Sequence, residues 1–481
     1  MKQSSLLSIG LLSGLAVTYV VFAFEAWQLL FATFLLVLAL PPLIDLTSHQ
    51  FDLFSTRNIF CLGYFQAFGL STLYSVLIQC RHIDRSRFME LLPLTLGCVL
   101  IGLIAYYLGY YSGVGRDLSR RLPALASRWN SARLPGLLAA YVAIGLAALG
   151  TMILQSGGLR YYLLHLYDIN EILLGKQYLF IVAKGFLLYA LMFSEAWSCE
   201  TGRPGYRIMS LALLSLTLIA SLFFGFRGII ALVFICPIIV RRYLGGPGIS
   251  GLLVGFGLLI VIVLPVYSRL RTLSLPSGSS VAMLIAQADS GIEYSDIPVL
   301  LFQREYGIES LTLVLQQVGR TVPAARGRTL LSILTEVIPR GLWADKPLSI
   351  GFEFTTTFMA RNIYGKRLVS SISTLPGELY WNFLWPGVII GMLLTGIASS
   401  TADEYLAHHL GKSSVLLHVA MLMYFAAINE GGIAGHMVMD LLSFAIPAVA
   451  GCLYLASSLP QSPADIWPSL NGGVLTHRAY R

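Results

Sequence analysis

A short charged passage, IPRGLWADKP at residues 338–347, interrupts a chain that consists mostly of long apolar runs. Arg340 and Lys346 carry the positive charge that a phosphate or carboxylate ligand needs. Trp343 offers an amphipathic ring that suits a sugar face or a membrane interface. The prolines near both ends stiffen the backbone, so we expect these side chains to keep a fixed spacing. An ion pair between Asp345 and Arg340 that only locks the loop is the alternative explanation.

The segment around this passage, residues 267–373, takes its positive charge almost entirely from arginine. The basic residues are Arg269, Arg271, Arg304, Arg320, Arg326, Arg328, Arg340, Arg361 and Arg367, together with Lys346 and Lys366. A guanidinium group grips phosphate or carboxylate through a planar, permanently charged fork. The segment therefore indicates an anionic ligand, although nearby acids or lipid headgroups would explain any single arginine. We favour the ligand role for Arg340 and for Arg227, which lies earlier in the chain.

Membrane helices are the elements that must position these residues. Of the 481 residues, 56% are hydrophobic and only 12% are charged, whereas soluble domains carry about 25% charged residues. Apolar runs of about 18 residues or more, enough to cross a bilayer, recur along the chain. We expect an all-α polytopic membrane protein with about 12 transmembrane helices. Their approximate cores are 4–24, 27–46, 58–78, 91–111, 134–154, 178–197, 208–226, 228–240, 249–266, 374–397, 413–428 and 437–457.

The charge and the cysteines exclude two other classes of partner. A net charge of +8 would suggest nucleic acid in a soluble chain, but the cytoplasmic loops of membrane proteins collect Lys and Arg. We therefore expect no nucleic-acid partner. The six cysteines lie in or beside apolar runs without paired spacing, so neither a disulfide framework nor a zinc site is indicated.

The distribution of arginine predicts the orientation of the helices. Residues 112–133 contain five arginines and one acid, Asp117, which places this loop in the cytoplasm. Counting helices from there puts both termini inside and residues 267–373 outside. We expect an N-terminal transmembrane bundle at 1–266, a large, partly helical outer loop at 267–373, and C-terminal helices with a short tail at 374–481. The first apolar run is expected to be a retained helix rather than a removed signal peptide.

The stretch 208–240 is too long for one upright helix and short for two. Arg227 lies near its middle, between Gly225 and Gly228. A lone arginine at the bilayer centre is costly, whereas an arginine at a glycine-flanked turn can reach the interface. We therefore predict a tight helical hairpin with Arg227 at its outer turn.

Several polar residues lie in or near the other predicted spans. Lys184 is either functional or a long side chain that reaches the outer surface. His418 is expected to make a helix–helix hydrogen bond. Glu430 and His436 fall in a glycine-rich outer turn and are expected to be solvated there, the alternative being that they complete the site with Asn429.

Two passages together resemble the Wzy-type O-antigen and oligosaccharide repeat-unit polymerases. IPRGLWADKP is followed by STLPGELYWNFLWPGVIIGMLLTG at 373–396. In that family a Pro-Arg…Trp…Lys-Pro passage in a large periplasmic loop precedes a Gly-Glu-x-Tyr-x-Asn-Phe passage that opens the next span. Arg227-Gly228 is similar to the family's Arg-Gly step at the outer end of a central helix pair. One departure is visible, because Leu384 stands where the family pattern leads us to expect glycine after Asn-Phe.

The resemblance implies a reaction on the periplasmic face of a bacterial inner membrane. A growing glycan on undecaprenyl pyrophosphate is transferred to the sugar of a newly flipped, undecaprenyl-pyrophosphate-linked repeat unit. The family is similar to the C-type membrane glycosyltransferases and is thought to work without a metal or other cofactor. Membrane lipid, a chain-length regulator and a flippase are the implied partners. A pyrophosphate is already a good leaving group, so the protein must mainly supply cations and orientation.

The resemblance also gives roles to individual residues. Cations at Arg227, Arg340 and Lys346, with Arg304 and Arg320 nearby in sequence, would stabilise the pyrophosphate, and Trp343 and Tyr380 would line the sugar path. The general base for the acceptor hydroxyl would be Glu378, with Glu336 or Asp345 in reserve. A helix-capping role for Glu378 near Pro376-Gly377 is the alternative.

Two other functions fit the same layout. An O-antigen ligase would use the same donor with a lipid A-core acceptor. A transporter of polysaccharide or lipid-linked oligosaccharide should have two related halves with interrupted helices in corresponding positions. The chain instead has one large loop after the ninth predicted span, which argues against a transporter.

Overall fold

The computed structural model describes most of residues 25–456. The described stretches are 25–125, 128–164, 176–224, 227–246, 306–336, 350–359 and 373–456, with a few single positions between them. Within these stretches the regular structure is entirely helical and contains no strand. The all-α class predicted from the sequence is therefore confirmed for this part of the chain.

Eight helices in the described part are long and apolar enough to cross a membrane. They are α2 (Ala26–Thr47), the continuous run α3 (Thr56–Tyr64), η1 (Phe65–Leu70) and α4 (Ser71–Leu77), α5 (Arg85–Tyr111), α7 (Leu134–Gln155), α10 (Gln177–Thr201), α11 (Pro204–Leu222), α20 (Leu375–His408) and α21 (Lys412–Asp440). The chain is a multi-pass membrane protein. The predicted span at 4–24 and most of that at 249–266 lie outside the described residues. The predicted spans at 228–240 and 437–457 fall in helices that are not among these eight, so the expected number of 12 remains a prediction.

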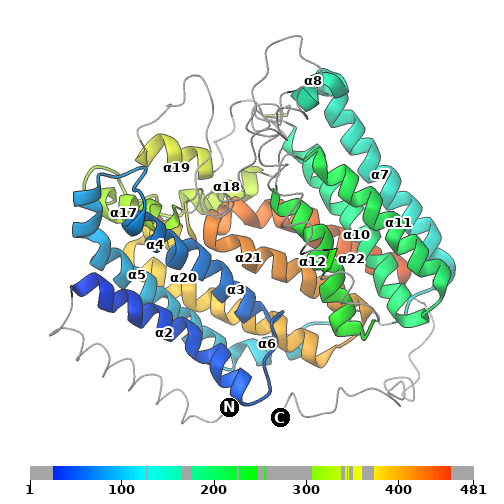
Figure 1. Ribbon diagram of the computed structural model, residues 1–481, viewed down its shortest axis with the longest axis horizontal. Helices are drawn as coiled ribbons and strands as arrows, with labels where there is room; N and C mark the ends of the chain where they lie inside the picture. The colour runs from blue at the N-terminus through cyan, green and yellow to red at the C-terminus, as the bar shows by residue number, and fades with distance from the viewer. Residues whose placement is uncertain are drawn as a thin grey trace.

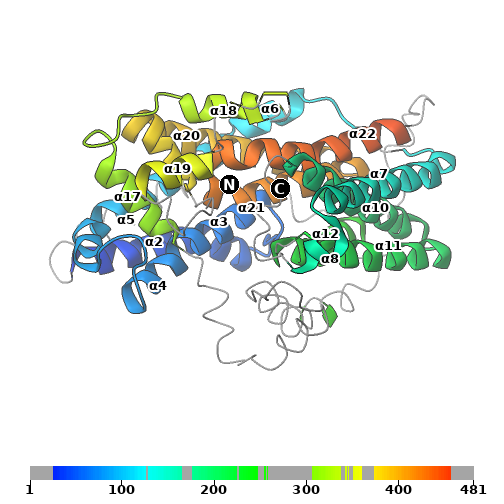
Figure 2. The same cartoon turned by 90° about the horizontal axis from the view of Figure 1, so that it is seen from above.

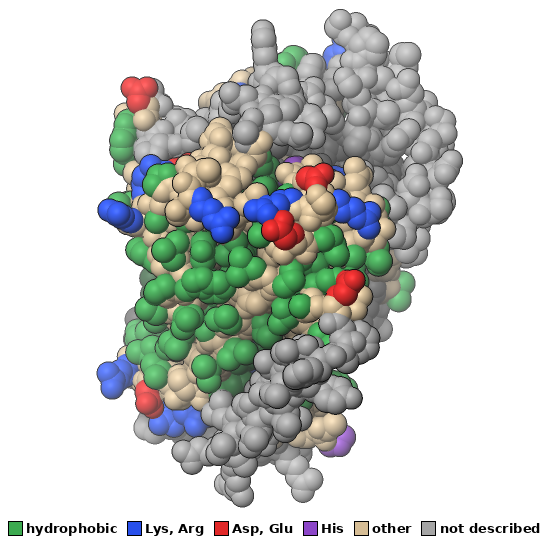
Figure 3. All heavy atoms as spheres, turned by 90° about the vertical axis from the view of Figure 1, so that its left-hand side faces the viewer, with side chains coloured by type: hydrophobic (Ala, Val, Ile, Leu, Met, Phe, Trp, Pro, Cys, Tyr) green, Lys and Arg blue, Asp and Glu red, His purple; other side chains and the backbone are tan. Residues whose placement is uncertain are grey.

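The molecular surface has the polarity that a membrane requires. Figure 3 shows a broad belt of hydrophobic side chains over one side of the helical bundle, with basic and acidic side chains gathered mainly above and below it. Leu36, Leu43, Leu94, Ile101 and Leu108 on α2 and α5 are among the exposed apolar side chains. Exposed leucine at this density is stable in hydrocarbon rather than in water.

The helices form two groups that share α20 and α21 (Figures 1 and 2). One group, with α2, α3, α5 and α20, packs around Phe34, Phe60, Tyr64 and Tyr106. The other group contains α7, α10, α12 (Arg227–Leu244) and α22 (Ile446–Leu455). Helices α20 and α21 lie against each other between the groups. A shift of either helix would therefore alter the packing of both groups.

The predicted hairpin at 208–240 is present. Helix α11 ends at Leu222 and α12 begins at Arg227. Leu218, near the end of α11, packs with Leu213 and Leu214 against Ile230 and Val233 of α12, so the two helices run side by side. Arg227 is the first residue of α12; its side chain lies outside the described residues.

Three helices come from the predicted outer loop: α17 (Gly307–Gln317), α18 (Arg328–Glu336) and α19 (Ile350–Phe358). They lie at the end of the bundle opposite to α6 (Val114–Arg121), which belongs to the arginine-rich loop 112–133 (Figure 1). Helix α20 connects these ends, since Glu378 near its start contacts α18 and Tyr405 near its end contacts Pro123. The described parts of the two loops are thus at opposite ends of the bundle, and the orientation of these ends in the membrane stays a prediction.

Helix α17 is embedded in the bundle rather than lying on its surface. Its residues from Gly307 to Leu315 are all buried. Glu309 is completely buried and accepts hydrogen bonds from Ser75 Oγ (2.7 Å) and from the backbone N–H groups of Arg81 (2.9 Å) and His82 (2.8 Å). This acid therefore holds α17 to the turn between α4 and α5. Burial and the charge of Glu309 raise the pKa of the nearby Cys80 to about 11.

Lys184 does not reach the outer surface. Its side chain is buried in α10, and Nζ lies 4.5 Å from the ring centre of Phe444 and 5.7 Å from that of Phe180. Cation–π contacts of this kind partly replace the hydration that the ammonium group loses. The alternative in which Lys184 extends to the interface is therefore wrong. The other alternative, a functional role for Lys184, stays a prediction.

Candidate functional site

A hydrogen-bonded polar region lies in the segment 373–382, which contains the first eight residues of α20. Thr374 begins this helix as its N-cap, and its hydroxyl accepts from the Gly377 N–H at 3.2 Å. Pro376, in the first turn, needs no hydrogen-bond partner for its nitrogen. A helix that starts this way points Glu378 and Asn382, four residues apart, to the same side.

Helix α20 is broken directly after this segment. Phe383 and Leu384 have non-helical backbone angles. Pro386 has no N–H to donate to the carbonyl of Asn382, four residues earlier, and its ring would clash there. The carbonyl of Asn382 accepts instead from the Arg326 N–H (3.1 Å), and that of Trp381 from the Ala325 N–H (2.8 Å). The break therefore attaches the start of α20 to the loop before α18.

Leu384 adopts a left-handed backbone angle, with φ 56° and ψ −147°. Glycine reaches this region without strain, whereas other residues lose about 1–3 kcal/mol there. The departure from the Asn-Phe-Gly pattern thus falls at a position whose backbone suits glycine. The chain keeps the glycine-type conformation without the glycine.

A second break lies in α21, at Gly432, where φ is 73° and ψ is −174°. The carbonyl groups of the two residues before Gly432 accept hydrogen bonds from the start of the 373–382 segment. The Thr374 N–H donates to the Glu430 carbonyl and the Ser373 hydroxyl donates to the Gly431 carbonyl, both at 3.0 Å. The breaks in α20 and α21 are therefore joined through one short stretch of chain.

Glu378 completes the junction. Its side chain is fully buried. Oε1 accepts from the Thr329 hydroxyl (3.0 Å), and Oε2 accepts from the Ala434 N–H (3.2 Å) just beyond the break in α21. A carboxylate is favourable at the exposed N–H groups that begin a helix. The alternative that Glu378 caps the start of its own helix is therefore wrong, because Thr374 caps that helix. Glu378 accepts instead from one of the first N–H groups of the second part of α21.

Gly432 is required for space as well as for conformation. A Cβ atom at this position would overlap Glu378 Oε2. Only glycine combines this backbone angle with so close an approach of a charged oxygen.

Thr329 and Asn382 connect α18 to the same carboxylate. Both side chains are buried. The Asn382 amide donates to the Thr329 hydroxyl oxygen (2.6 Å) and to the Glu378 carbonyl (2.9 Å), and its oxygen accepts from the Gly327 N–H (2.9 Å). Each of these side chains holds the next one in place, so the carboxylate has a fixed position.

A set of exposed arginines surrounds this junction. Arg320, Arg326 and Arg328 are exposed, and the last two lie beside the residues that bond Asn382 and Glu378. Arg328 forms an ion pair with Glu353 of α19. The three arginines therefore lie on the segment 320–328, whose backbone is bonded to the start of α20 near this buried acid.

The structure brings together only some of the residues predicted from the sequence. Glu378 and Tyr380 lie in the junction, with Arg320 at its edge. Trp343 and Asp345 are exposed and belong to no described helix. Arg304, Arg340 and Lys346 lie outside the described residues, as does the side chain of Glu336 at the end of α18.

Other residues of the junction were not predicted from the sequence. Thr329 is an ordinary helical threonine in the sequence, and nothing marks it. The Gly431–Gly432 pair was interpreted as part of a solvated turn, and that interpretation of Glu430 is wrong. Glu430 is half-buried and accepts from the Gln66 side chain at 3.0 Å. The two adjacent glycines, Gly431 and Gly432, are the sequence signal from which a helix break could have been predicted.

Comparison with known proteins gives no relative: no family model, no curated protein and no solved structure matches this chain. The functional argument therefore depends on the residues themselves. A carboxylate fixed by neutral donors, beside arginines at a membrane surface, can orient or deprotonate a hydroxyl while cations hold a phosphate.

Proposed function

We propose that this protein is a membrane glycosyltransferase that polymerises undecaprenyl-pyrophosphate-linked oligosaccharide repeat units on the periplasmic face of a bacterial inner membrane. The observation that carries the proposal is the junction around Glu378, where a fixed acid, two helix breaks and an arginine edge meet at one end of the bundle. The similarity of this passage and of IPRGLWADKP to the Wzy-type polymerases supports the same function.

The chemistry divides between two kinds of side chain. The glycosidic bond to pyrophosphate breaks as negative charge grows on the leaving group, and guanidinium groups stabilise that charge. We assign this role to Arg320, an exposed arginine after α17, and Arg227, Arg340 and Lys346 keep the roles that the sequence resemblance implies. The acceptor hydroxyl must lose a proton as it attacks, and Glu378 is the acid that the junction fixes for this step.

Glu378 is enclosed in the described arrangement, because both carboxylate oxygens accept hydrogen bonds and the side chain has no exposed surface. A role as general base therefore requires the second part of α21 to move away from it when the acceptor binds. The glycine break at 432 is the point about which such a movement would occur. Without that movement, Glu378 only positions the junction.

The transporter alternative receives limited support from the breaks. Interrupted helices do form the substrate sites of many transporters, but in those proteins they occupy corresponding positions of two repeats. Here the breaks lie in α20 and α21, which follow each other directly in the chain. Two neighbouring helices that bond to each other fit one enzymatic site better than a repeated transport pathway.

The proposal is tested with the purified full-length protein and a lipid-pyrophosphate-linked repeat unit from the source organism. A ladder of lipid-linked products differing by one repeat unit is expected, without added nucleotide sugar. Arg320→Ala should slow ladder formation, whereas Arg203→Ala, an exposed arginine at the opposite end of the bundle, should not. Unchanged single repeat units with a protein that remains folded would refute the proposal.

Glu378→Gln separates the two roles of the acid. Glutamine keeps the size of the side chain and one acceptor oxygen for the Ala434 N–H, but it cannot take a proton. Loss of ladder formation in a folded Glu378→Gln protein would support the general base. Retained ladder formation would leave Glu378 as a positioning residue.

A further inference from the structure

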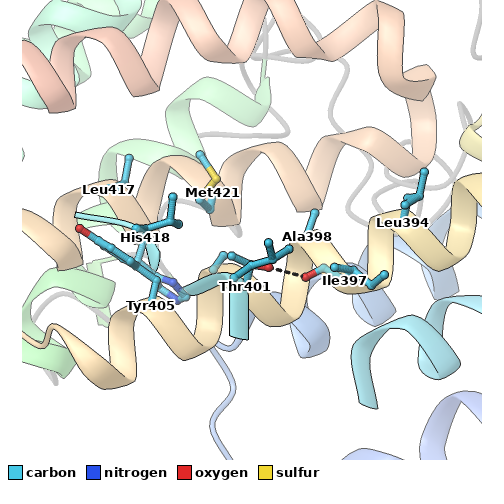
Figure 4. A pocket seen from close by; sticks show the side chains of 11 residues that line it. Leu394, Ile397, Ala398, Thr401, Tyr405, Leu417, His418 and Met421 are labelled. Carbon is cyan, nitrogen blue, oxygen red and sulfur yellow. Dashed lines mark hydrogen bonds between the residues drawn. The ribbon is translucent and has the colours of Figure 1, made fainter. Parts of the chain in front are cut away.

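A pocket of about 370 Å³ lies at the end of the bundle opposite to Glu378, between α6, α20 and α21 (Figure 4). Leu118 and Leu122 come from α6, and Leu394, Ile397, Ala398, Thr401, Ala402 and Tyr405 come from α20. Leu417, His418 and Met421 on α21 complete the wall. Its size lies within the range of small-molecule and lipid sites.

The wall offers no hydrogen-bond donor to a ligand. The Tyr405 hydroxyl donates to the Pro123 carbonyl (3.0 Å), and the Thr401 hydroxyl donates to the Ile397 carbonyl (2.8 Å) within its own helix. His418 Nε2 lies 3.0 Å from the Phe54 carbonyl. Because a carbonyl can only accept, Nε2 carries the proton, and the unpartnered Nδ1 is left as an acceptor. A phosphate could not bind to such a wall, so the interior suits a hydrocarbon chain.

The residues that lie next to Leu118 and Leu122 in the chain have the opposite character. Gly115 and Ser119 of α6 are buried, with Gly115 close to Ser400 of α20, so this face of α6 packs on the bundle. Arg120 and Arg121, in the last turn of α6, are exposed and form no ion pair within the described part of the chain. A short amphipathic helix with arginines on its polar side is typical of the membrane interface.

We propose that this pocket binds one acyl chain of an anionic phospholipid, while Arg120 and Arg121 hold the phosphate of its headgroup. The apolar wall admits the chain, and the two arginines, which lie between Leu118 and Leu122 in the sequence, supply the complementary charge. The lipid belongs to the leaflet in which the arginine-rich loop 112–133 lies. This inference is independent of the proposed catalytic function, because none of the pocket residues belongs to the Glu378 junction.

The test uses the full chain in phosphatidylcholine vesicles that contain a small fraction of phosphatidylglycerol with a photoreactive diazirine in one acyl chain. After illumination, mass spectrometry locates the cross-linked peptides. Cross-links should concentrate on the peptides that contain Leu118–Leu122 and Leu394–Thr401. Phosphatidylcholine carrying the same diazirine should label these peptides less.

Two sets of variants, each with a matched control, test the binding of the lipid's acyl chain and of its headgroup separately. Ala398→Trp should fill the pocket and lower its labelling to that of other lipid-facing peptides, whereas Ala147→Trp on the exposed surface of α7 should leave it unchanged. Arg120→Gln and Arg121→Gln should each weaken labelling by phosphatidylglycerol about fivefold, since one basic residue near an anionic surface contributes ~1 kcal/mol. Arg203→Gln and Arg207→Gln, each made singly at an exposed arginine, are the charge-matched controls.

Several outcomes would overturn the inference. Labelling spread evenly over all lipid-facing helices and unaffected by Ala398→Trp would mean ordinary contact with bulk lipid. Equal labelling by the phosphatidylcholine probe would remove the role of the arginines. Displacement by a polyprenyl phosphate but not by phosphatidylglycerol would assign the pocket to an isoprenoid chain, and cross-links to a second copy of the chain would assign it to a protein interface.

Discussion

The substitution Gly432→Ala tests the junction where its geometry is tightest. Alanine at φ 73° and ψ −174° would be strained by about 1–3 kcal/mol. Its Cβ would also overlap Glu378 Oε2, so the carboxylate would have to move and lose its hydrogen bond to the Ala434 N–H. A hydrogen bond to a charged group contributes about 1.5–3 kcal/mol. We therefore expect Gly432→Ala to destabilise the folded protein by about 2.5–6 kcal/mol.

The cysteines of the chain provide the assay. Cys61, Cys98, Cys236 and Cys452 are buried, so a fluorogenic maleimide reports their exposure as the detergent-solubilised protein is heated. Gly97→Ala is the matched control, because Gly97 lies in α5 with no atom near the position of the new Cβ. Alanine there should be neutral or stabilise the helix slightly.

The reasoning is refuted if Gly432→Ala unfolds at the same temperature as the wild type and Gly97→Ala. A second variant keeps the test specific to the carboxylate. Combining Gly432→Ala with Glu378→Ala removes the overlap but not the backbone strain, so the two effects should be less than additive. Strict additivity would mean that the close approach of Glu378 to Gly432 has no energetic consequence.

Three further predictions concern single side chains. Thr329→Val removes the hydroxyl between Glu378 and Asn382 and should destabilise the protein by about 1–3 kcal/mol in the same assay, with little effect expected of Thr356→Val. Cys80 should react slowly with an impermeant maleimide at pH 7 and faster as the pH rises towards its pKa of about 11; fast labelling at pH 7 would contradict its partly buried position. Burial lowers the pKa of His409 below its ordinary value of 6.5, so its contribution to stability should be complete above pH 6.5 and lost as the pH falls below that value. The unfolding temperature of His409→Gln should depend less on pH in that range, and an unchanged pH dependence would show that His409 is not responsible.

The membrane helices could be predicted from the sequence because each one follows from a long apolar run. Helix α7 was expected at 134–154 and is found at Leu134–Gln155, and the hairpin of α11 and α12 was expected from its length and its glycines. The burial of α17 was not predicted. Apolar residues at helical spacing indicate one buried face, but the position of α17 inside the bundle buries Glu309 and its neighbours as well. Periodicity reports which face is apolar and says nothing of how deeply a helix is embedded.

The candidate site could be predicted only in part. Glu378 stood out because it opens a span beside Pro376 and Gly377. Its partners Thr329 and Ala434 lie 49 and 56 residues away in the chain, and no local pattern in one sequence specifies a contact of that range. The break after Asn382 follows from Pro386, which is visible in the sequence. The donors that satisfy the free carbonyl groups, Ala325 and Arg326, become apparent only once the chain is folded.

The length distribution of the cell-surface glycan tests the central proposal most directly. In a strain that lacks this protein, the polymerase function predicts a single repeat unit on the lipid A core, with long chains restored by the wild-type gene. Long chains that accumulate on undecaprenyl pyrophosphate would indicate a ligase, and single units trapped inside the cell would indicate a flippase. An unchanged distribution of chain lengths would contradict the account.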